Sequence, residues 1–206
     1  MERVCRNWAE EAFDDTLVQE TYWEEFVRNA TAASAEIHRV RDYAAAGEIV
    51  LTLCRELQAR KIVAVGAQES AAVAAVYTAL ETAGCEVYTD KFAIAEQAPT
   101  ADVGISTAEF GVGETASVCV DAYSYEARVV GMLPPVHIVF LPAWAMVRDV
   151  TTAFQVISRV FQRGYAGFIT GPSRTADIER VLTLGCHGPS LFIIIAVEER
   201  CKGGES

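Results

Sequence analysis

The hydrophobic positions of the chain form short continuous runs that alternate with stretches of helical periodicity. The runs are expected to be buried strands, and they lie within residues 35–40, 61–66, 86–89, 102–106, 117–121, 136–141, 167–170 and 191–197. Between several of them the spacing predicts amphipathic helices over 47–60, 70–84 and 149–163. Continuous apolar strands separated by helices are typical of a parallel or mixed sheet covered on both faces. The pattern therefore predicts an α/β fold, with ligands at the carboxyl ends of the strands.

The first part of the chain has a different pattern. Aromatic and aliphatic residues recur at near-helical spacing among many acids over 7–34, which predicts a helix with one aromatic side. That side must pack either on the rest of the chain or on a partner chain. We expect an N-terminal helical arm over 1–34, followed by an α/β domain over 35–206.

Composition narrows the possible functions. The chain has 206 residues, of which 51% are hydrophobic, and a formal net charge of -11. Such an acidic surface repels phosphate backbones, so nucleic-acid binding is not expected. The N-terminus is acidic and lacks an apolar signal region, which predicts a cytoplasmic protein. The apolar segment 129–147 carries three prolines and reads as a buried strand between proline stops, so no membrane span is expected.

The six cysteines do not predict a metal or cluster site. They lie at positions 5, 54, 85, 119, 186 and 201, and none forms a CxxC pair. Their spacing matches no zinc or iron–sulfur signature. We expect reduced thiols, and neither a metal nor a cofactor held by this chain.

The run GVGETA, residues 111–116, nominally satisfies a dinucleotide-binding fingerprint. That fingerprint needs a strand before it and a helix after it, whereas a strand-like run follows here. The glycines are therefore expected to allow a tight turn and a close backbone approach. Beside Gly113, this turn places Glu114, Thr115 and Ser117 either in a ligand cleft or on a solvated hairpin.

The run GFITGPSRTADI, residues 167–178, ends a strand with hydroxyls and an arginine. We expect a helix to start near Ser173 or Thr175, with either hydroxyl as the cap and Asp177 favoured by the helix dipole. Helix initiation does not explain Arg174, whose charge is unfavourable there unless an anion faces it. Its planar fork suits a carboxylate or a phosphate.

Two histidines complete the set of candidates. His187 lies in a glycine- and proline-rich turn, and His137 lies inside an apolar strand run. Each is either a hydrogen-bonded structural residue or a proton-transfer group.

Three stretches resemble one known family: ADVGISTAEFGVGETASV, LPPVHIVFLP and ITGPSRTADIERVLTLGCHGP. Their order and the final pairing of GPSRTADIE with a GxHGP run are similar to the LUD-domain family, of the lactate utilization protein C type. The clear similarity covers about 100–197. One departure is that many relatives have glycine where this chain has Ala116, and a left-handed backbone there would cost on the order of 1 kcal/mol.

The resemblance implies a three-layer α/β fold with a mostly parallel or mixed sheet, similar to the NagB/RpiA/CoA transferase-like fold. It also implies a small accessory, ligand-binding subunit of a system that oxidises L-lactate to pyruvate, with iron–sulfur clusters on companion subunits. In this hypothesis a small carboxylate or phosphate-bearing ligand lies in one cleft. The cleft residues would be the candidate catalytic residues Glu114, His137 and His187 and the candidate ligand-binding residues Gly113, Thr115, Ser117, Gly171, Ser173, Arg174, Thr175 and Asp177.

Two alternatives remain open at this point. The chain could be a stand-alone enzyme of the isomerase or CoA-transferase type, with Glu114 as nucleophile, an idea that depends on fold analogy. It could also be a non-catalytic structural subunit that presents its N-terminal arm to a partner.

Overall fold

The structure is a computed structural model that describes residues 19, 21–160, 165–177, 181–184 and 188–200. Its centre is a six-stranded sheet in which every neighbouring pair is parallel. In spatial order the strands are β1 (Glu36–Val40), β12 (Leu191–Val197), β7 (Val136–Pro142), β4 (Val103–Thr107), β2 (Lys61–Ala64) and β3 (Glu86–Tyr88). The predicted α/β class with a mostly parallel sheet is confirmed.

Two helices cover one face of this sheet, α2 (Tyr43–Glu56) and α3 (Ala71–Thr82). Each begins at a capping side chain, because Asp42 accepts a hydrogen bond from the Ala45 amide and Ser70 accepts one from the Val73 amide. Both helices were predicted, although the cap at Asp42 starts α2 several residues before the amphipathic pattern does.

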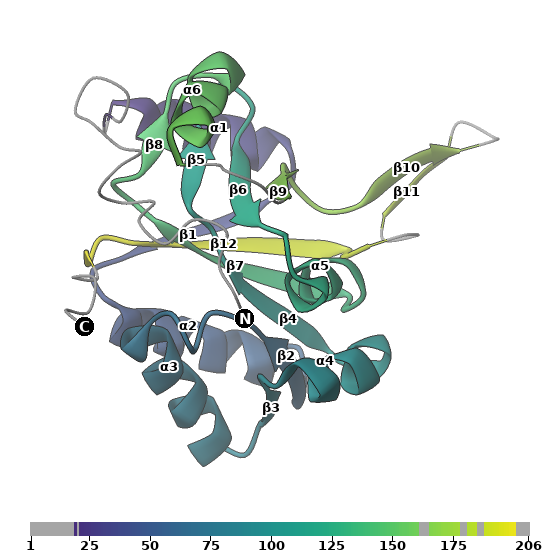
Figure 1. The fold of residues 1–206 in the computed structure, drawn as a ribbon. Helices are drawn as coiled ribbons and strands as arrows, with labels where there is room; N and C mark the ends of the chain where they lie inside the picture. Colours follow the sequence, from purple (N-terminus) through teal and green to yellow (C-terminus); the bar gives the residue numbers. More distant parts are fainter. Residues whose placement is uncertain (1–18, 20, 161–164, 178–180, 185–187, 201–206) are drawn as a thin grey trace.

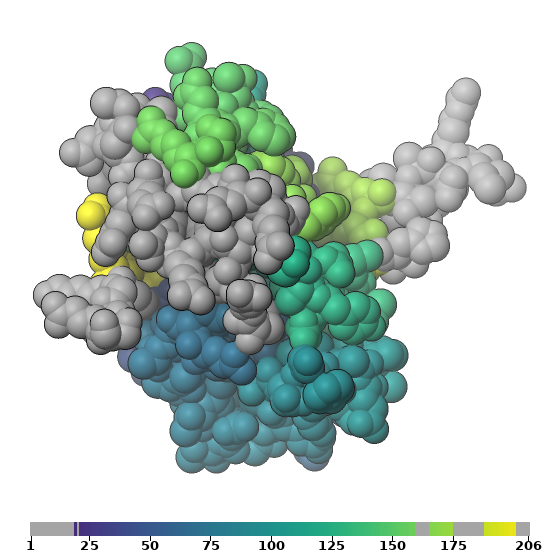
Figure 2. All heavy atoms as spheres, viewed as in Figure 1, coloured from purple at the N-terminus to yellow at the C-terminus, as the bar shows by residue number. Residues whose placement is uncertain are grey.

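The opposite face carries α1 (Tyr22–Ala32), α4 (Lys91–Gln97) with a 3-10 turn (Ala98–Thr100), α5 (Tyr125–Met132) and a second sheet. The strands of this second sheet, in spatial order, are β8 (Met146–Val147), β5 (Phe110–Val112), β6 (Ser117–Asp121) and β9 (Ala166–Ile169). Helix α6 (Val150–Val160) packs on the outer face of this small sheet. In the space-filling view α6 lies at the end of the molecule opposite α2 and α3 (Figure 2).

The helix α1 packs into the body of the protein. Phe26 and Ala30 are fully buried in a cluster that joins α1, the small sheet and the central strands β7 and β12. Of the predicted helix over 7–34, residues 7–18 and 20 lie outside the described residues. The division into an arm and a domain at residue 34 stays a prediction.

The helix expected after Ser173 is not formed, and this prediction was wrong. Residues Arg174–Asp177 instead form β10, which pairs antiparallel with β11 (Val181–Leu184) in a hairpin that projects from the body (Figure 1). The β-branched residues of the run VLTL suit a strand. The pairing of β10 with β11 therefore outweighs the local preference of Ser173 and Thr175 for capping a helix.

The apolar segment 129–147 contributes to three separate elements. It holds the end of α5, the buried strand β7 and the short strand β8. Over the described ranges, no helix combines the length and the apolar character that crossing a membrane requires. The strand predicted at 136–141 is confirmed.

Candidate functional site

The turn that holds Glu114 joins β5 to the antiparallel strand β6, so GVGETA is a hairpin turn and not a nucleotide fingerprint. The Asn29 amide on α1 donates to the main-chain oxygens of Gly113 and Glu114, at 2.9 Å each. A Cβ atom at Gly113 would lie 3.3 Å from the Arg148 carbonyl oxygen, which explains the glycine as a close backbone approach. The Asn29 hydrogen bonds fix the turn against α1, and the close approach at Gly113 places it against the residues that precede α6.

The carboxylate of Glu114 is directed toward the start of α6. It accepts a hydrogen bond of 3.4 Å from the Val150 amide, the first residue of that helix. A carboxylate is favoured at this position because the first amides of a helix lack partners within the helix. The contact gives Glu114 a structural role that its sequence context did not indicate.

Three hydroxyls form a chain at the end of the small sheet. The Ser117 hydroxyl lies 2.8 Å from the Thr115 hydroxyl and 2.8 Å from the hydroxyl of Thr170, the residue that follows β9. Between the first two, Ala116 has a φ of 55° and is fully buried. The suspected left-handed backbone is thus present, and burial of the Ala116 methyl group offsets part of its cost.

Arg174 lies beside the residues that follow the end of α1. Its guanidinium donates a 2.7 Å hydrogen bond to the Ser34 hydroxyl. Within the described residues this exposed guanidinium forms no ion pair with a carboxylate. The Ser173 amide donates to the Pro189 carbonyl, and a Cβ atom at Gly171 would lie 2.8 Å from the Ala33 carbonyl oxygen. Arg174 therefore offers a positive charge next to two serines.

The end of α1 brings two of the predicted stretches together. Asn29 holds the Glu114 turn, Ser34 receives Arg174, and the Ser117–Thr170 contact joins the same two stretches directly. Thr175 and Asp177 are backbone members of β10. His187 lies outside the described residues.

His137 is not at this surface. It is fully buried on β7, and its Nε2 atom lies 2.9 Å from the hydroxyl of Ser106 on the neighbouring strand β4. In the described part of the chain its Nδ1 atom has no hydrogen-bond partner. Burial lowers the pKa of His137 to about 4, so the imidazole is neutral at pH 7.

Acidification is expected to destabilise the protein through His137. The unfolded histidine titrates near its ordinary pKa of 6.5, so below that value the unfolded state binds a proton that the folded state rejects until about pH 4. Stability is complete above pH 6.5 and falls as the pH falls, by about 2 kcal/mol at pH 5. Urea unfolding at pH 7.5 and pH 5, for the wild type and for His137→Asn, measures this loss. Equal losses in the two proteins would contradict the assignment.

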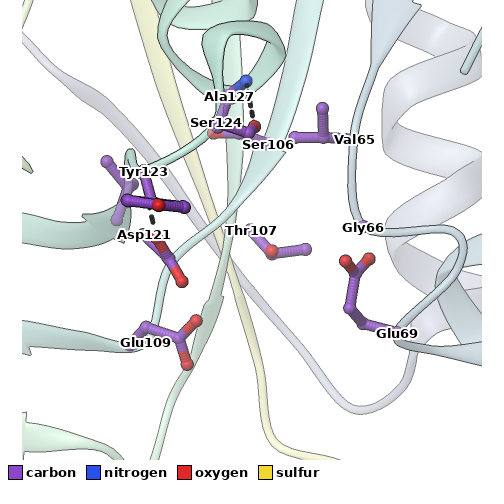
Figure 3. Close-up of a pocket in the computed structure, with 11 residues that line it drawn as sticks. Val65, Gly66, Glu69, Ser106, Thr107, Glu109, Asp121, Tyr123, Ser124 and Ala127 are labelled. Carbon is purple, nitrogen blue, oxygen red and sulfur yellow. Dashed lines mark hydrogen bonds between the residues drawn. The ribbon is translucent and has the colours of Figure 1, made fainter. Parts of the chain in front are cut away.

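A small pocket opens at the carboxyl ends of β2 and β4, where α/β sheets commonly bind ligands. Its cavity measures about 40 Å³ and is lined by Ser106, Thr107 and three acids, Glu69, Glu109 and Asp121. Figure 3 shows the carboxylates of Glu109 and Asp121 on one side and that of Glu69 on the other. Sequence reasoning missed this pocket, although the polar run STAE after an apolar strand was the available signal.

The pocket and the Arg174 region are separate. They lie at opposite ends of β6, since Ser117 contacts Thr170 while Asp121 lines the pocket, and the five residues of the strand span roughly 13 Å. Ser106 lines the pocket, and His137 contacts Ser106 from the buried side. Among the residues that the structure describes, no group of three His, Cys, Asp or Glu side chains could hold a metal ion.

Comparison with known proteins finds one family and relatives that share one name. The family model described as LUD domain matches residues 23–197. Lactate utilization protein C of Bacillus velezensis is 34% identical over 110 residues, covering 51% of this chain and 46% of that protein. The Bacillus subtilis protein of the same name is 33% identical over 110 residues. The chain spans about half the length of the curated relatives it matches.

A similar fold is found in a crystal structure of a DUF162 family protein from Deinococcus radiodurans. The TM-score is 0.61 at 18% sequence identity, and the match covers 87% of this chain and 99% of that one. At this identity the likeness concerns the fold alone.

Proposed function

The chain belongs to the LUD domain family, and from this premise we propose that it acts in lactate utilization as a small, ligand-binding accessory subunit. The proposal is supported by relatives named lactate utilization protein C, which are about one-third identical to this chain over the matched region. Because the chain spans about half their length, their full activity is not assumed for it.

The proposed partners are companion iron–sulfur subunits in the cytoplasm. In this arrangement the companions carry the electrons that leave L-lactate as it becomes pyruvate, while this chain binds the carboxylate-bearing ligand. The partner assignment rests on the family resemblance, and copurification of the full-length chain with cysteine-rich redox proteins would support it.

The observation that carries the ligand proposal is the uncompensated charge of Arg174. Within the described residues its guanidinium contacts only a neutral hydroxyl, that of Ser34. A guanidinium with unused N–H groups favours a bidentate contact with a carboxylate. Ser34 and Ser173 would supply hydroxyl groups to the same ligand. If that ligand is L-lactate, its 2-hydroxyl group can accept hydrogen bonds from these serines or donate to them.

The acidic pocket is a poorer place for such a ligand. Its carboxylates, Glu69, Glu109 and Asp121, would repel the carboxylate of lactate at neutral pH. The cavity of about 40 Å³ suits one or two water molecules better than an organic acid. We therefore assign ligand binding to the Arg174 region.

A second candidate function is that of a stand-alone enzyme, and the pair of Ser106 and His137 favours it. A serine hydroxyl hydrogen-bonded to a neutral imidazole beside a pocket is an arrangement used in nucleophilic catalysis. Against this, the low pKa of His137 makes it a weak base, and nearby carboxylates disfavour the build-up of negative charge.

Deletion of the gene for this chain is expected to abolish growth on L-lactate as sole carbon source, because lactate oxidation would lose a required subunit. Growth on glucose should be unchanged. Reintroducing the wild-type gene should restore growth on lactate, and growth curves in the two media measure the effect.

Growth of the deletion strain tests the role in lactate utilization, and an assay of the purified chain separates the two candidates. Wild-type growth of the deletion strain on L-lactate would contradict a role in lactate utilization. Lactate-dependent reduction of a redox dye by the purified chain alone would contradict the accessory role and support the stand-alone enzyme.

A further inference from the structure

Two cysteines meet in a surface groove on the side of the molecule covered by α2 and α3. Cys54 lies in the last turn of α2, is 3% exposed and belongs to the main core cluster. Cys85 lies just before β3, is partly exposed and packs against the same cluster. Both line the groove, and both are free thiols.

The backbone holds the two residues in place. The Ala59 amide donates to the Cys54 carbonyl at 2.8 Å, and the Cys85 amide donates to the Leu80 carbonyl at 3.0 Å. Gly84, with a φ of 93°, makes the left-handed turn that ends α3 and delivers Cys85 to the groove. The pair therefore does not depend on a flexible loop.

The two cysteines line the same groove and pack against the same core cluster. Burial is the main cause that raises the pKa of Cys54 to about 12, and the nearby Cys85 raises it further. The inner thiol stays protonated and the outer thiol faces the groove. Arg55 and Arg60 line the same groove and place positive charge near its mouth.

We propose that Cys54 and Cys85 form a reversible disulfide by exchange with a small anionic disulfide. Cys85 is the attacking residue because it is the more exposed one, and thiol–disulfide exchange needs access to the sulfur. The arginines attract an anionic reagent to the groove. This site does not depend on the proposed role in lactate utilization.

The exchange takes two steps. The thiolate of Cys85 attacks one sulfur of the reagent, which forms a mixed disulfide and releases the first reagent thiolate. The sulfur of Cys54 then attacks the sulfur of Cys85, and its proton passes to the second departing thiolate. One reagent disulfide is reduced to two thiols, and two protein thiols are oxidised to one disulfide.

The test uses the full-length chain and glutathione disulfide. Peptide mapping by mass spectrometry is expected to find a bond between the peptides that contain residues 54 and 85, and dithiothreitol should remove it. Because the bond closes a loop of roughly 30 residues, we expect the oxidised protein to melt about 5 °C higher than the reduced one. A background with Cys5, Cys186 and Cys201 changed to serine removes pairings with these three cysteines, and the remaining one, Cys119, is fully buried.

Single variants test the order of the steps. Cys54→Ala is expected to retain one glutathione on Cys85, and Cys85→Ala is expected to leave Cys54 unmodified. The proposal would be overturned if the wild type kept glutathione on Cys85 without forming the internal bond. It would also be overturned if Cys54 reacted first, or if neither thiol reacted.

Discussion

Replacement of Phe26 by alanine is expected to lower the free energy of unfolding by about 3–5 kcal/mol. Phe26 is fully buried between α1, the small sheet and the central sheet, and its ring stacks on Trp23 with centroids 5.9 Å apart. A Cβ atom at Gly111 would lie 3.1 Å from the Phe26 ring, so this space is closely filled. Removing the ring leaves a cavity that the surrounding strands cannot fill.

Phe92→Ala on α4 is the matched control, because Phe92 is 73% exposed. The control is expected to change the free energy of unfolding by no more than about 0.5 kcal/mol. Chemical unfolding of the two variants and the wild type measures both effects. A loss below 1 kcal/mol for Phe26→Ala would mean that α1 is not part of the core and can detach from it to bind a partner chain.

The sequence predicted the four inner strands of the central sheet well because they are mostly apolar and buried on both faces. The run LFIIIAV became β12, in which all residues after Leu191 are buried, and VHIVFL became most of β7. A strand covered on both faces needs no alternation, so the continuous run is itself the signal. The helices α2 and α3 were found because each covers the sheet with one apolar stripe.

The elements that were missed carry weaker local signals. Helix α4 has seven residues and only one of them, Ile94, is buried, so it has no periodic stripe to detect. The strands β5 and β8 are three and two residues long and are stabilised by their pairing in the small sheet, β5 with β6 and β8 with β5. The hairpin of β10 and β11 replaced a predicted helix for a similar reason, since cross-strand pairing is not visible in local capping signals.

The candidate site was predicted in part. The sequence indicated that Glu114 and Arg174 needed explanation, and the structure explains the first by the start of α6. Glu114 lies near the start of α6 because of tertiary packing, and the sequence of a turn does not predict such packing. The burial of His137 against Ser106 follows from the register of β4 and β7, which also lay beyond a single-sequence reading.

Replacement of Arg174 by alanine is expected to weaken binding of L-lactate by the full chain about 100- to 1000-fold. Loss of two charge-assisted hydrogen bonds to a carboxylate costs about 3–4 kcal/mol. Folding should be unaffected, because the guanidinium is exposed and its contact within the described residues is one hydroxyl, that of Ser34. Arg174→Lys keeps the charge without the planar fork and should bind with intermediate affinity.

Arg28→Ala on α1 is the matched control for charge. The Arg28 side chain is 71% exposed and its ion pair with Glu25 measures 3.6 Å, so its removal changes the net charge equally and little else.

Isothermal titration of L-lactate into the wild type, Arg174→Ala and Arg28→Ala is the most direct test of the proposed ligand site. We predict binding to the wild type and to Arg28→Ala and its loss in Arg174→Ala. Equal affinity in Arg174→Ala and the wild type would contradict the account.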